Sequence, residues 1–175
     1  MSNYLELKVP VRWDAEWFAR LRERMAEEHI AVRWQTRYHH ITVAFINNDE
    51  PVEELTKVFE GMLVGRKAPQ LTFDTLDAFC AKDAPMTIVN LTASHPSPEF
   101  NILVDQLRES AHEQGADIDG NFLLHVTLGR IENTDVDAVK RVVSGIEVPP
   151  FTLRLKEAEY RYYRPMESIR SWTLE

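Results

Sequence analysis

Two short motifs carry the side chains of this chain that are best suited to chemistry. Residues 40–43 (HITV) and 125–128 (HVTL) share a histidine followed two positions later by a threonine. An imidazole titrates near neutral pH, so one histidine can act as a neutral base while a second acts as a charged acid. A threonine hydroxyl can donate a hydrogen bond to a phosphate oxygen. The motifs therefore indicate acid–base chemistry on a phosphodiester.

Both motifs lie in apolar runs rich in β-branched residues, which are typical of strands. Side chains alternate between the two faces of a strand, so His40 shares a face with Thr42, and His125 with Thr127. Two such strands side by side would bring both imidazoles and both hydroxyls into one cleft. We predict that the histidines are catalytic and that the threonines bind substrate. The intervening apolar residues are expected to face the core: Ile41, Val43, Phe45, Val126 and Leu128.

Chance offers another explanation, in which two unrelated strands simply carry polar outer faces. From composition alone, two such pairs among six histidines are expected in roughly one chain in twenty. The strand-like context of both motifs makes chance a weaker explanation, and the functional interpretation is favoured.

The elements around the motifs follow the same order twice. Hydrophobic periodicity predicts a strand, a helix, a motif strand, a helix and a further strand in each half of the chain. The short helix after the second motif is expected to begin at Thr134 as N-cap and to end at Gly145. The expected strands span residues 4–11, 38–46, 71–80, 86–93, 122–130, 151–163 and 169–174.

This repetition predicts the fold class. The two motif histidines are 85 residues apart (125 minus 40), close to half of the 175 residues. We therefore predict an α+β fold of two pseudo-symmetric lobes, each an antiparallel sheet with helices on its outer face, and an active-site cleft between them. No linker rich in Gly or Ser separates the halves. A single bilobal domain over residues 1–175 is expected, with a pseudo-repeat of 1–83 and 84–175.

Charge and composition limit the partners. The net charge is −8, with 20 basic against 28 acidic residues, and extended nucleic-acid binding depends on many basic contacts to phosphates. We expect no extended nucleic-acid binding; a small nucleotide or an RNA 3′ end held by a few arginines remains open. The N-terminus lacks a basic region followed by an apolar core, and no run approaches membrane-spanning length. A cytoplasmic protein without a membrane partner is expected.

Neither a metal nor a cofactor is predicted. The His-x-Thr pairs lack carboxylate or second-histidine neighbours at ligand spacing. Cys80 is the single cysteine, which excludes an internal disulfide and a cysteine-based metal cluster. His39 alternates to the opposite face from His40 and is expected to pack or cap locally.

Several arginines and a tyrosine are candidates for binding substrate. Arg130 follows Thr127 by three residues, and on a regular strand it would face away from it, so an ion pair and a substrate contact both stay open. Arg161 and Arg164 flank a tyrosine pair near the last expected hairpin, where arginine with aromatic neighbours can bind phosphate and stack a base. We include Arg161, Tyr163 and Arg164 as substrate-binding candidates, with a solvated strand edge as the alternative.

These motifs resemble the 2H phosphoesterases, especially the 2′,5′ RNA ligase-like cyclic phosphodiesterases. The resemblance is specific in residues 36–45 and 124–130 and looser in 160–164 and 171–174. It departs after the first motif, where the family has Leu-Gly and this chain has Ile46-Asn47. The resemblance implies metal-free hydrolysis of a 2′,3′-cyclic phosphate or a related phosphodiester. Separately, we expect a monomer. The resemblance further implies His125 as base, His40 as acid, and the two threonines as donors to the non-bridging oxygens.

Other functions use the same residues. The domain could bind a nucleotide or an RNA end without turnover, or hydrolyse a phosphodiester metabolite unrelated to RNA. Ligation of 2′,5′ RNA ends is the reverse of the same chemistry. Activity on a panel of cyclic phosphates, and its salt dependence with RNA against mononucleotides, would separate these hypotheses.

Overall fold

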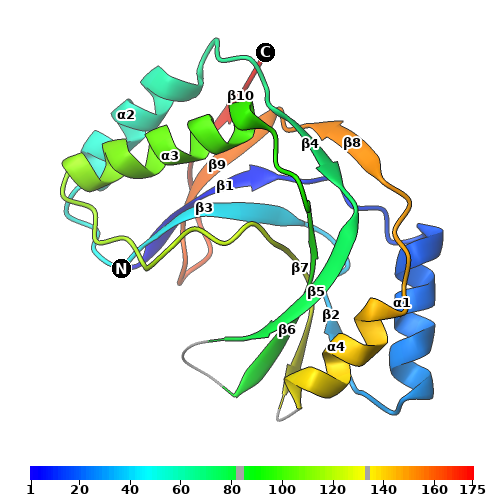
Figure 1. Ribbon diagram of the computed structural model, residues 1–175. Coiled ribbons are helices and arrows are strands. Elements are labelled where there is room, and N and C mark those ends of the chain that lie inside the picture. Colours follow the sequence, from blue (N-terminus) through cyan, green and yellow to red (C-terminus); the bar gives the residue numbers. More distant parts are fainter. Residues whose placement is uncertain (82–84, 133–134) are drawn as a thin grey trace.

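The computed structural model describes residues 1–81, 85–132 and 135–175 (Figure 1). Within these residues the chain forms an α+β fold, as predicted, in which the paired strands are antiparallel. The elements are, in order, β1 (Asn3–Lys8), α1 (Glu16–Glu27), β2 (Arg33–Trp34), β3 (His40–Ile46), α2 (Val52–Leu63), β4 (Gln70–Phe73), β5 (Thr75–Cys80), β6 (Met86–Thr92), α3 (Pro98–Glu113), β7 (Val126–Glu132), α4 (Val136–Ser144), β8 (Phe151–Arg154), β9 (Glu157–Tyr162) and β10 (Ser168–Thr173).

The two motif strands lie next to each other at the centre of a large sheet. Its strand order is β10-β9-β1-β3-β7-β6-β5, with β2 paired to β7. Helices α2 and α3 pack together at one end of the sheet, and α1 and α4 pack together at the other (Figure 1). Each side of the central pair combines strands from both halves of the chain. The β3–β7 junction is formed through Ile41 and Val126, so the two sides meet at the motifs themselves.

Two long strands predicted from the sequence are each broken in the structure. The expected strand 71–80 divides at Asp74 into β4 and β5, and the expected strand 151–163 divides into β8 and β9. Asp74 accepts hydrogen bonds from the backbone N–H of Ser94, at 2.9 Å, and from the Ser94 hydroxyl, which stabilises the break. The released segments β4 and β8 pair with each other as a separate two-stranded sheet. The apolar alternation changes phase at each break, from Leu71 and Phe73 to Leu76 and Ala78, and from Leu153 and Leu155 to Ala158 and Tyr160. The prediction of unbroken strands overlooked this change of phase.

The N-cap of the fourth helix lies one residue later than the sequence predicted. Thr134 lies outside the described residues. Asp135 is the N-cap of α4, and its side chain accepts a hydrogen bond from the backbone N–H of Asp137 at 2.9 Å. A short acidic side chain at this position satisfies an unpaired N–H of the first turn.

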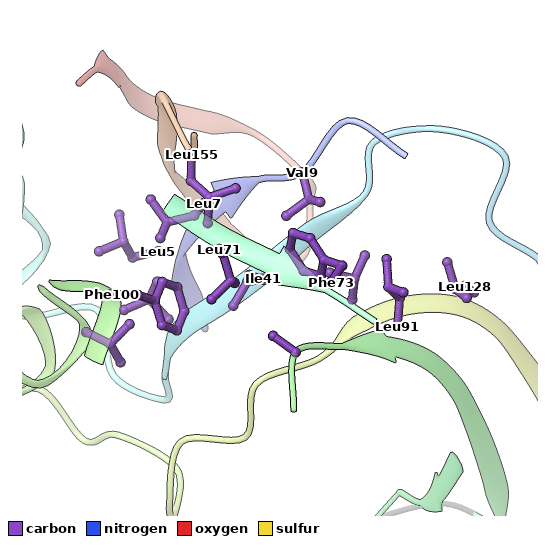
Figure 2. Packing of buried hydrophobic residues seen from close by; sticks show 14 of the residues in the cluster. Leu5, Leu7, Val9, Ile41, Leu71, Phe73, Leu91, Phe100, Leu128 and Leu155 are labelled. Atoms are coloured by element: carbon purple, nitrogen blue, oxygen red, sulfur yellow. The ribbon is translucent and has the colours of Figure 1, made fainter. Parts of the chain in front are cut away.

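The core lies on one face of the large sheet and leaves the other face for the cleft. Leu71 and Phe73 of β4 lie over Leu5, Leu7 and Ile41 of the central strands (Figure 2), and these five side chains are at most 1% exposed. Complete burial of such side chains contributes about 1.5–3 kcal/mol each before the entropy cost of ordering them. This packing holds the strand faces in place, so the residues that alternate with the core are presented on the opposite side.

Both motif strands contain a β-bulge at the same position of the motif. In β3 the register with β1 shifts at Val43, because Ala44 pairs with Leu5 whereas Thr42 pairs with Glu6. In β7 the register with β6 shifts in the same way at Leu128. Each bulge inserts one residue that has no partner on the neighbouring strand, which changes the face of everything that follows it.

The bulges bring two further side chains onto the cleft face. Val43 and Ala44 are both buried, and so are Leu128 and Gly129, so the residue after each buried pair returns to the cleft. That residue is Phe45 in β3 and Arg130 in β7. The prediction that Phe45 belongs to the core was wrong, because it assumed unbroken alternation.

Gly129 permits the close approach of β2 to the bulged strand. It pairs with Trp34, and a Cβ atom built on it would lie 2.5 Å from Val32 Cγ1 and 3.0 Å from Trp34 Cε3. We expect Gly129→Ala to lower the free energy of unfolding by about 1–3 kcal/mol through overpacking. Thermal unfolding should show a Tm lower by roughly 2–4 °C per kcal/mol.

The matched control for this prediction is the same change at Gly61 in α2, where nothing lies within 4 Å of the added Cβ. Alanine favours a helix interior over glycine by up to about 1 kcal/mol, so Gly61→Ala should raise the Tm. Equal effects of the two variants would contradict the close packing at Gly129.

Candidate active site

A cavity of about 570 Å³ opens on the cleft face where the two motif strands meet. The four motif side chains His40, Thr42, His125 and Thr127 line it together with Arg130. Residue numbers increase in opposite directions along antiparallel strands. The pairing of Ile41 with Val126 therefore places His40 opposite Thr127, and Thr42 opposite His125. The structure thus brings all four predicted motif residues to one site with approximate two-fold symmetry.

Each histidine is held by the same backbone contact. His40 Nδ1 lies 3.0 Å from the carbonyl oxygen of Tyr38, and His125 Nδ1 lies 2.9 Å from that of Leu123. A carbonyl oxygen only accepts hydrogen bonds, so Nδ1 carries the proton in both rings. Nε2 is therefore the nitrogen of each imidazole that is left to exchange a proton with a bound molecule.

The two imidazoles differ in their surroundings. Glu6 of β1 places Oε2 at 3.0 Å from His40 Nδ1. His125 instead meets the edge of the Phe79 ring, with centroids 5.1 Å apart and planes at 88°. Burial lowers the pKa of both histidines, and the charge of His40 lowers that of His125 further. The site therefore contains one imidazole beside a carboxylate and one beside an aromatic ring.

Arg130 supplies a permanent positive charge to the cavity. The bulge at Leu128 turns its side chain to the face of Thr127, which the regular alternation of a strand would not do. One guanidinium nitrogen, Nη1, donates to Gln35 Oε1 at 3.2 Å, which orients the group. Of the two interpretations left open by the sequence, the structure places Arg130 where it can contact a bound anion.

Three aromatic side chains, Tyr4, Phe45 and Tyr163, form an aromatic wall of the cavity. The Phe45 ring stacks with Tyr4 at 6.3 Å and meets Tyr163 edge-on at 5.2 Å. All three residues line the cavity, and Tyr163 is 38% exposed. Of the three, the sequence had predicted only Tyr163. Tyr4 alternates with apolar residues in β1 and could have been found from that alternation; Phe45 required knowledge of the bulge.

The other two predicted arginines do not line the cavity. Arg161 of β9 is turned toward carboxylates, with Nη1 at 3.7 Å from Glu6 Oε1 and 3.6 Å from Glu159 Oε2. Arg164 is exposed and lies over the ring of Tyr163, with its Cζ atom 5.1 Å from the ring centroid. Arg164 therefore contacts the ring of Tyr163 without lining the cavity, and Arg161 belongs to a charged cluster beside His40.

The segment that departs from the family pattern supports a loop that lines the cavity. Asn47 donates from Nδ2 to Asp119 Oδ1 at 2.7 Å, and its backbone N–H donates to the carbonyl of Asp117 at 2.9 Å. Asp119 lines the cavity. Asn47 thus fixes the loop that precedes the second motif strand.

His39 lies on the opposite face from His40, as the alternation predicted. It is 5% exposed, and its Nε2 lies 2.9 Å from the Gln35 carbonyl. Among the described residues, no three His, Cys, Asp or Glu side chains are grouped so that they could hold a metal ion. Within the same part of the chain, no helix is both long and apolar enough to cross a bilayer.

Solved structures share this fold along their whole length. Kluyveromyces marxianus Usb1 is 12% identical with a TM-score of 0.69, over 99% of this chain and 98% of that protein. E. coli LigT, in a complex with 3′-AMP, is 19% identical with a TM-score of 0.59, over 98% of this chain and 97% of LigT. The PDE domain of MHV ns2 is 11% identical with a TM-score of 0.55, over 97% of this chain and 99% of that domain.

Sequence comparison gives the family. A search of curated proteins finds no match. Residues 10–164 match the family model of the 2′-5′ RNA ligase superfamily, which is most of the chain and includes both motifs. The chain is therefore a 2H phosphoesterase of the 2′-5′ RNA ligase superfamily.

Proposed function

We propose that the protein hydrolyses a 2′,3′-cyclic phosphate, or a closely related phosphodiester, at a nucleotide or RNA 3′ end by two-histidine catalysis without a metal. The observation that carries this proposal is the pair of imidazoles in one cavity, each anchored through Nδ1 and each with Nε2 available. Acid–base catalysis needs one proton acceptor and one proton donor within reach of the same phosphorus atom.

The proposed step uses the two histidines in opposite protonation states. Neutral His125 takes a proton from water at Nε2 while the water oxygen attacks phosphorus. The bond from phosphorus to one ribose oxygen breaks, and protonated His40 gives its Nε2 proton to that oxygen. The product is a phosphomonoester, with His125 charged and His40 neutral, and exchange with solvent restores the starting states.

The other residues of the cavity bind the substrate in this proposal. The hydroxyls of Thr42 and Thr127 donate to the non-bridging phosphate oxygens, and Arg130 balances the negative charge that grows in the transition state. The aromatic wall offers a ring face on which a nucleobase can stack, and Arg164 lies against the ring of Tyr163. E. coli LigT was solved with 3′-AMP, NADP+ and ATP, and K. marxianus Usb1 with uridine monophosphate, which supports a nucleotide as ligand.

A panel of 2′,3′-cyclic mononucleotides tests the proposal. Turnover should persist in the presence of a chelator, and the position of the phosphate in the product identifies the oxygen that leaves. Binding without turnover would favour a nucleotide-binding module, and turnover confined to phosphodiesters without a nucleoside would favour a metabolite enzyme. Joining of RNA ends that carry a cyclic phosphate and a 5′-hydroxyl would favour the ligase.

A second cavity favours an RNA end over a mononucleotide as the substrate. It has a volume of about 490 Å³, and one of its lining residues, Lys8, pairs in register with His40. Its lining contains four basic side chains and one acidic side chain, in a protein whose net charge is −8. These are Lys8, Arg37, Arg154 and Lys156, with Glu157. Phosphates of the nucleotides that precede the reacting end are the anions that such a cavity would fit.

Charge reversal in this second cavity should separate the two substrates. We expect the double variant Arg37→Glu/Lys156→Glu to raise KM for an oligonucleotide ending in a cyclic phosphate and to leave that for the cyclic mononucleotide unchanged. Each lost phosphate contact lowers the slope of log K against log salt by about 0.7 for a single strand, or about 1.4 for two. An equal change for both substrates, or no change for the oligonucleotide, would remove the RNA-end preference.

A further inference from the structure

A buried carboxylate stands directly behind one of the two catalytic histidines. Glu6 lies on the cleft face of β1, between Tyr4 and Lys8 in the alternation, and is 3% exposed. Its Oε2 atom is 3.0 Å from His40 Nδ1, the nitrogen that also contacts the Tyr38 carbonyl. A carboxylate removed from water requires a charged or hydrogen-bonding partner, and here the imidazole is the nearest one.

The permanent cations near Glu6 lie farther from it than the imidazole of His40 does, or pair with Glu159. Lys8 Nζ lies 2.9 Å from Glu159 Oε2. Arg161 Nη1 lies 3.6 Å from Glu159 Oε2 and 3.7 Å from Glu6 Oε1. Both distances from Arg161 exceed that of a good hydrogen bond. Arg161 Nε is buried without a hydrogen-bond partner among the described residues. The short contact of Glu6 is therefore with His40, while Arg161 lies farther away and its positive charge lowers the pKa of the carboxyl.

The second histidine has no such neighbour within the described part of the chain. The ion pairs found there include His40 and none includes His125. His125 Nδ1 contacts the Leu123 carbonyl, and the ring packs against Phe79. The approximate two-fold symmetry of the site is broken at this point by one carboxylate.

We propose that Glu6 is a positioning residue that holds His40 in its protonated form, and that it thereby makes His40 the acid and leaves His125 as the base. This inference rests on the proposed function, since acid and base have meaning only for a proton transfer reaction. Glu6 touches no substrate atom in this account; it acts through His40.

The charges around the pair determine the direction of the effect. Burial lowers the pKa of His40, and the positive charges of Arg130, Arg161 and Lys8 lower it further. A carboxylate at Nδ1 opposes these effects because it stabilises the imidazolium. Burial also raises the pKa of Glu6 to about 7, so the carboxyl and the imidazole compete for a proton and their titration belongs to the pair. The charged or titratable groups that face the pair are Tyr4 and Lys8 of β1, Arg130 of β7 with His125 just before that strand, and Glu159 and Arg161 of β9.

NMR titration of the ring nitrogens of His40 tests this directly in the full chain without substrate. In Glu6→Gln the side chain keeps its size and loses its charge, and we expect the pKa of His40 to fall by roughly 1–3 pH units. The matched control is Glu159→Gln, which removes the same charge from the same cluster without touching the imidazole, and should move His40 much less. Unchanged titration of His40 in Glu6→Gln, or an equal shift in both variants, would overturn the proposal.

The pH profile of turnover supplies a readout that loss of structure would not imitate. The acid must be protonated, so the alkaline limb for a cyclic mononucleotide should move to lower pH in Glu6→Gln. A substrate with a nitrophenolate leaving group needs no acid, and its hydrolysis should be nearly unchanged. Equal loss on both substrates would overturn the assignment of His40 as acid.

These measurements keep the inference separate from the proposed function. If the wild type hydrolyses no phosphodiester and the titration still shifts, the control of the His40 proton by Glu6 stands and the proposed reaction fails. If the glutamine variant does not fold, Glu6→Asp keeps the charge but withdraws it from Nδ1, and an intermediate pKa is expected. A wild-type value in a folded Glu6→Asp protein would contradict the need for contact.

Discussion

Replacing either cleft histidine by alanine should lower kcat/KM for a 2′,3′-cyclic mononucleotide by about 10²–10⁴-fold. That range corresponds to about 2.7–5.5 kcal/mol of transition-state stabilisation. The reason is the shared cavity, in which His40 and His125 each present Nε2 and no other imidazole lines the same space among the described residues. Steady-state kinetics in the presence of a chelator measures the effect.

A change of leaving group should affect the activities of the two histidine variants differently. With a nitrophenolate leaving group, His40→Ala should recover most of its activity, whereas His125→Ala should stay impaired because water still needs a base. His112→Ala is the control, since this histidine is exposed on α3 and away from the cavity. If either cleft variant retained more than a tenth of wild-type activity on the cyclic nucleotide, the two-histidine mechanism would be wrong.

The convergence of these histidines could be predicted because it depends only on strand periodicity and pairing. His40 and Thr42 are two residues apart, and no bulge lies between them; the same holds for His125 and Thr127. The α+β class followed from the alternation of strand and helix patterns for similar reasons. Both inferences use local regularities that tertiary packing did not disturb.

The remaining site residues could not be placed because they lie beyond a local irregularity. Phe45 and Arg130 each follow a bulge, and an extra residue reverses the faces of a strand. Glycine within a strand often marks a bulge, and Gly129 was such a signal in β7; β3 contains no glycine, so its bulge had no such signal. Glu6 is a different case. Alternation in β1 predicts the face on which Glu6 lies, but it does not predict that β1 pairs with β3 and so brings Glu6 to His40.

Loss of Arg130 is the other change expected to have a large effect. Arg130→Ala should lower kcat/KM by about 10²–10³-fold, the usual cost of removing one preorganised donor from a developing negative charge. The group is half-buried, and Gln35 holds it at 3.2 Å, so it needs little reorganisation when the phosphate binds. Arg130→Lys keeps the charge but loses the forked geometry, and it should recover only part of the activity.

Arg33→Ala is the matched control for Arg130. Arg33 pairs in register with Arg130 on the neighbouring strand, but it is exposed and its Nη1 lies 3.9 Å from Glu132 Oε1. The two variants change the net charge equally, so a general electrostatic effect would affect both. A large loss confined to Arg130→Ala, mainly in kcat, would mean that its guanidinium binds the transition state more tightly than the bound substrate. Equal losses would mean that the bulge in β7 turns Arg130 toward the cavity without giving it a role in the reaction.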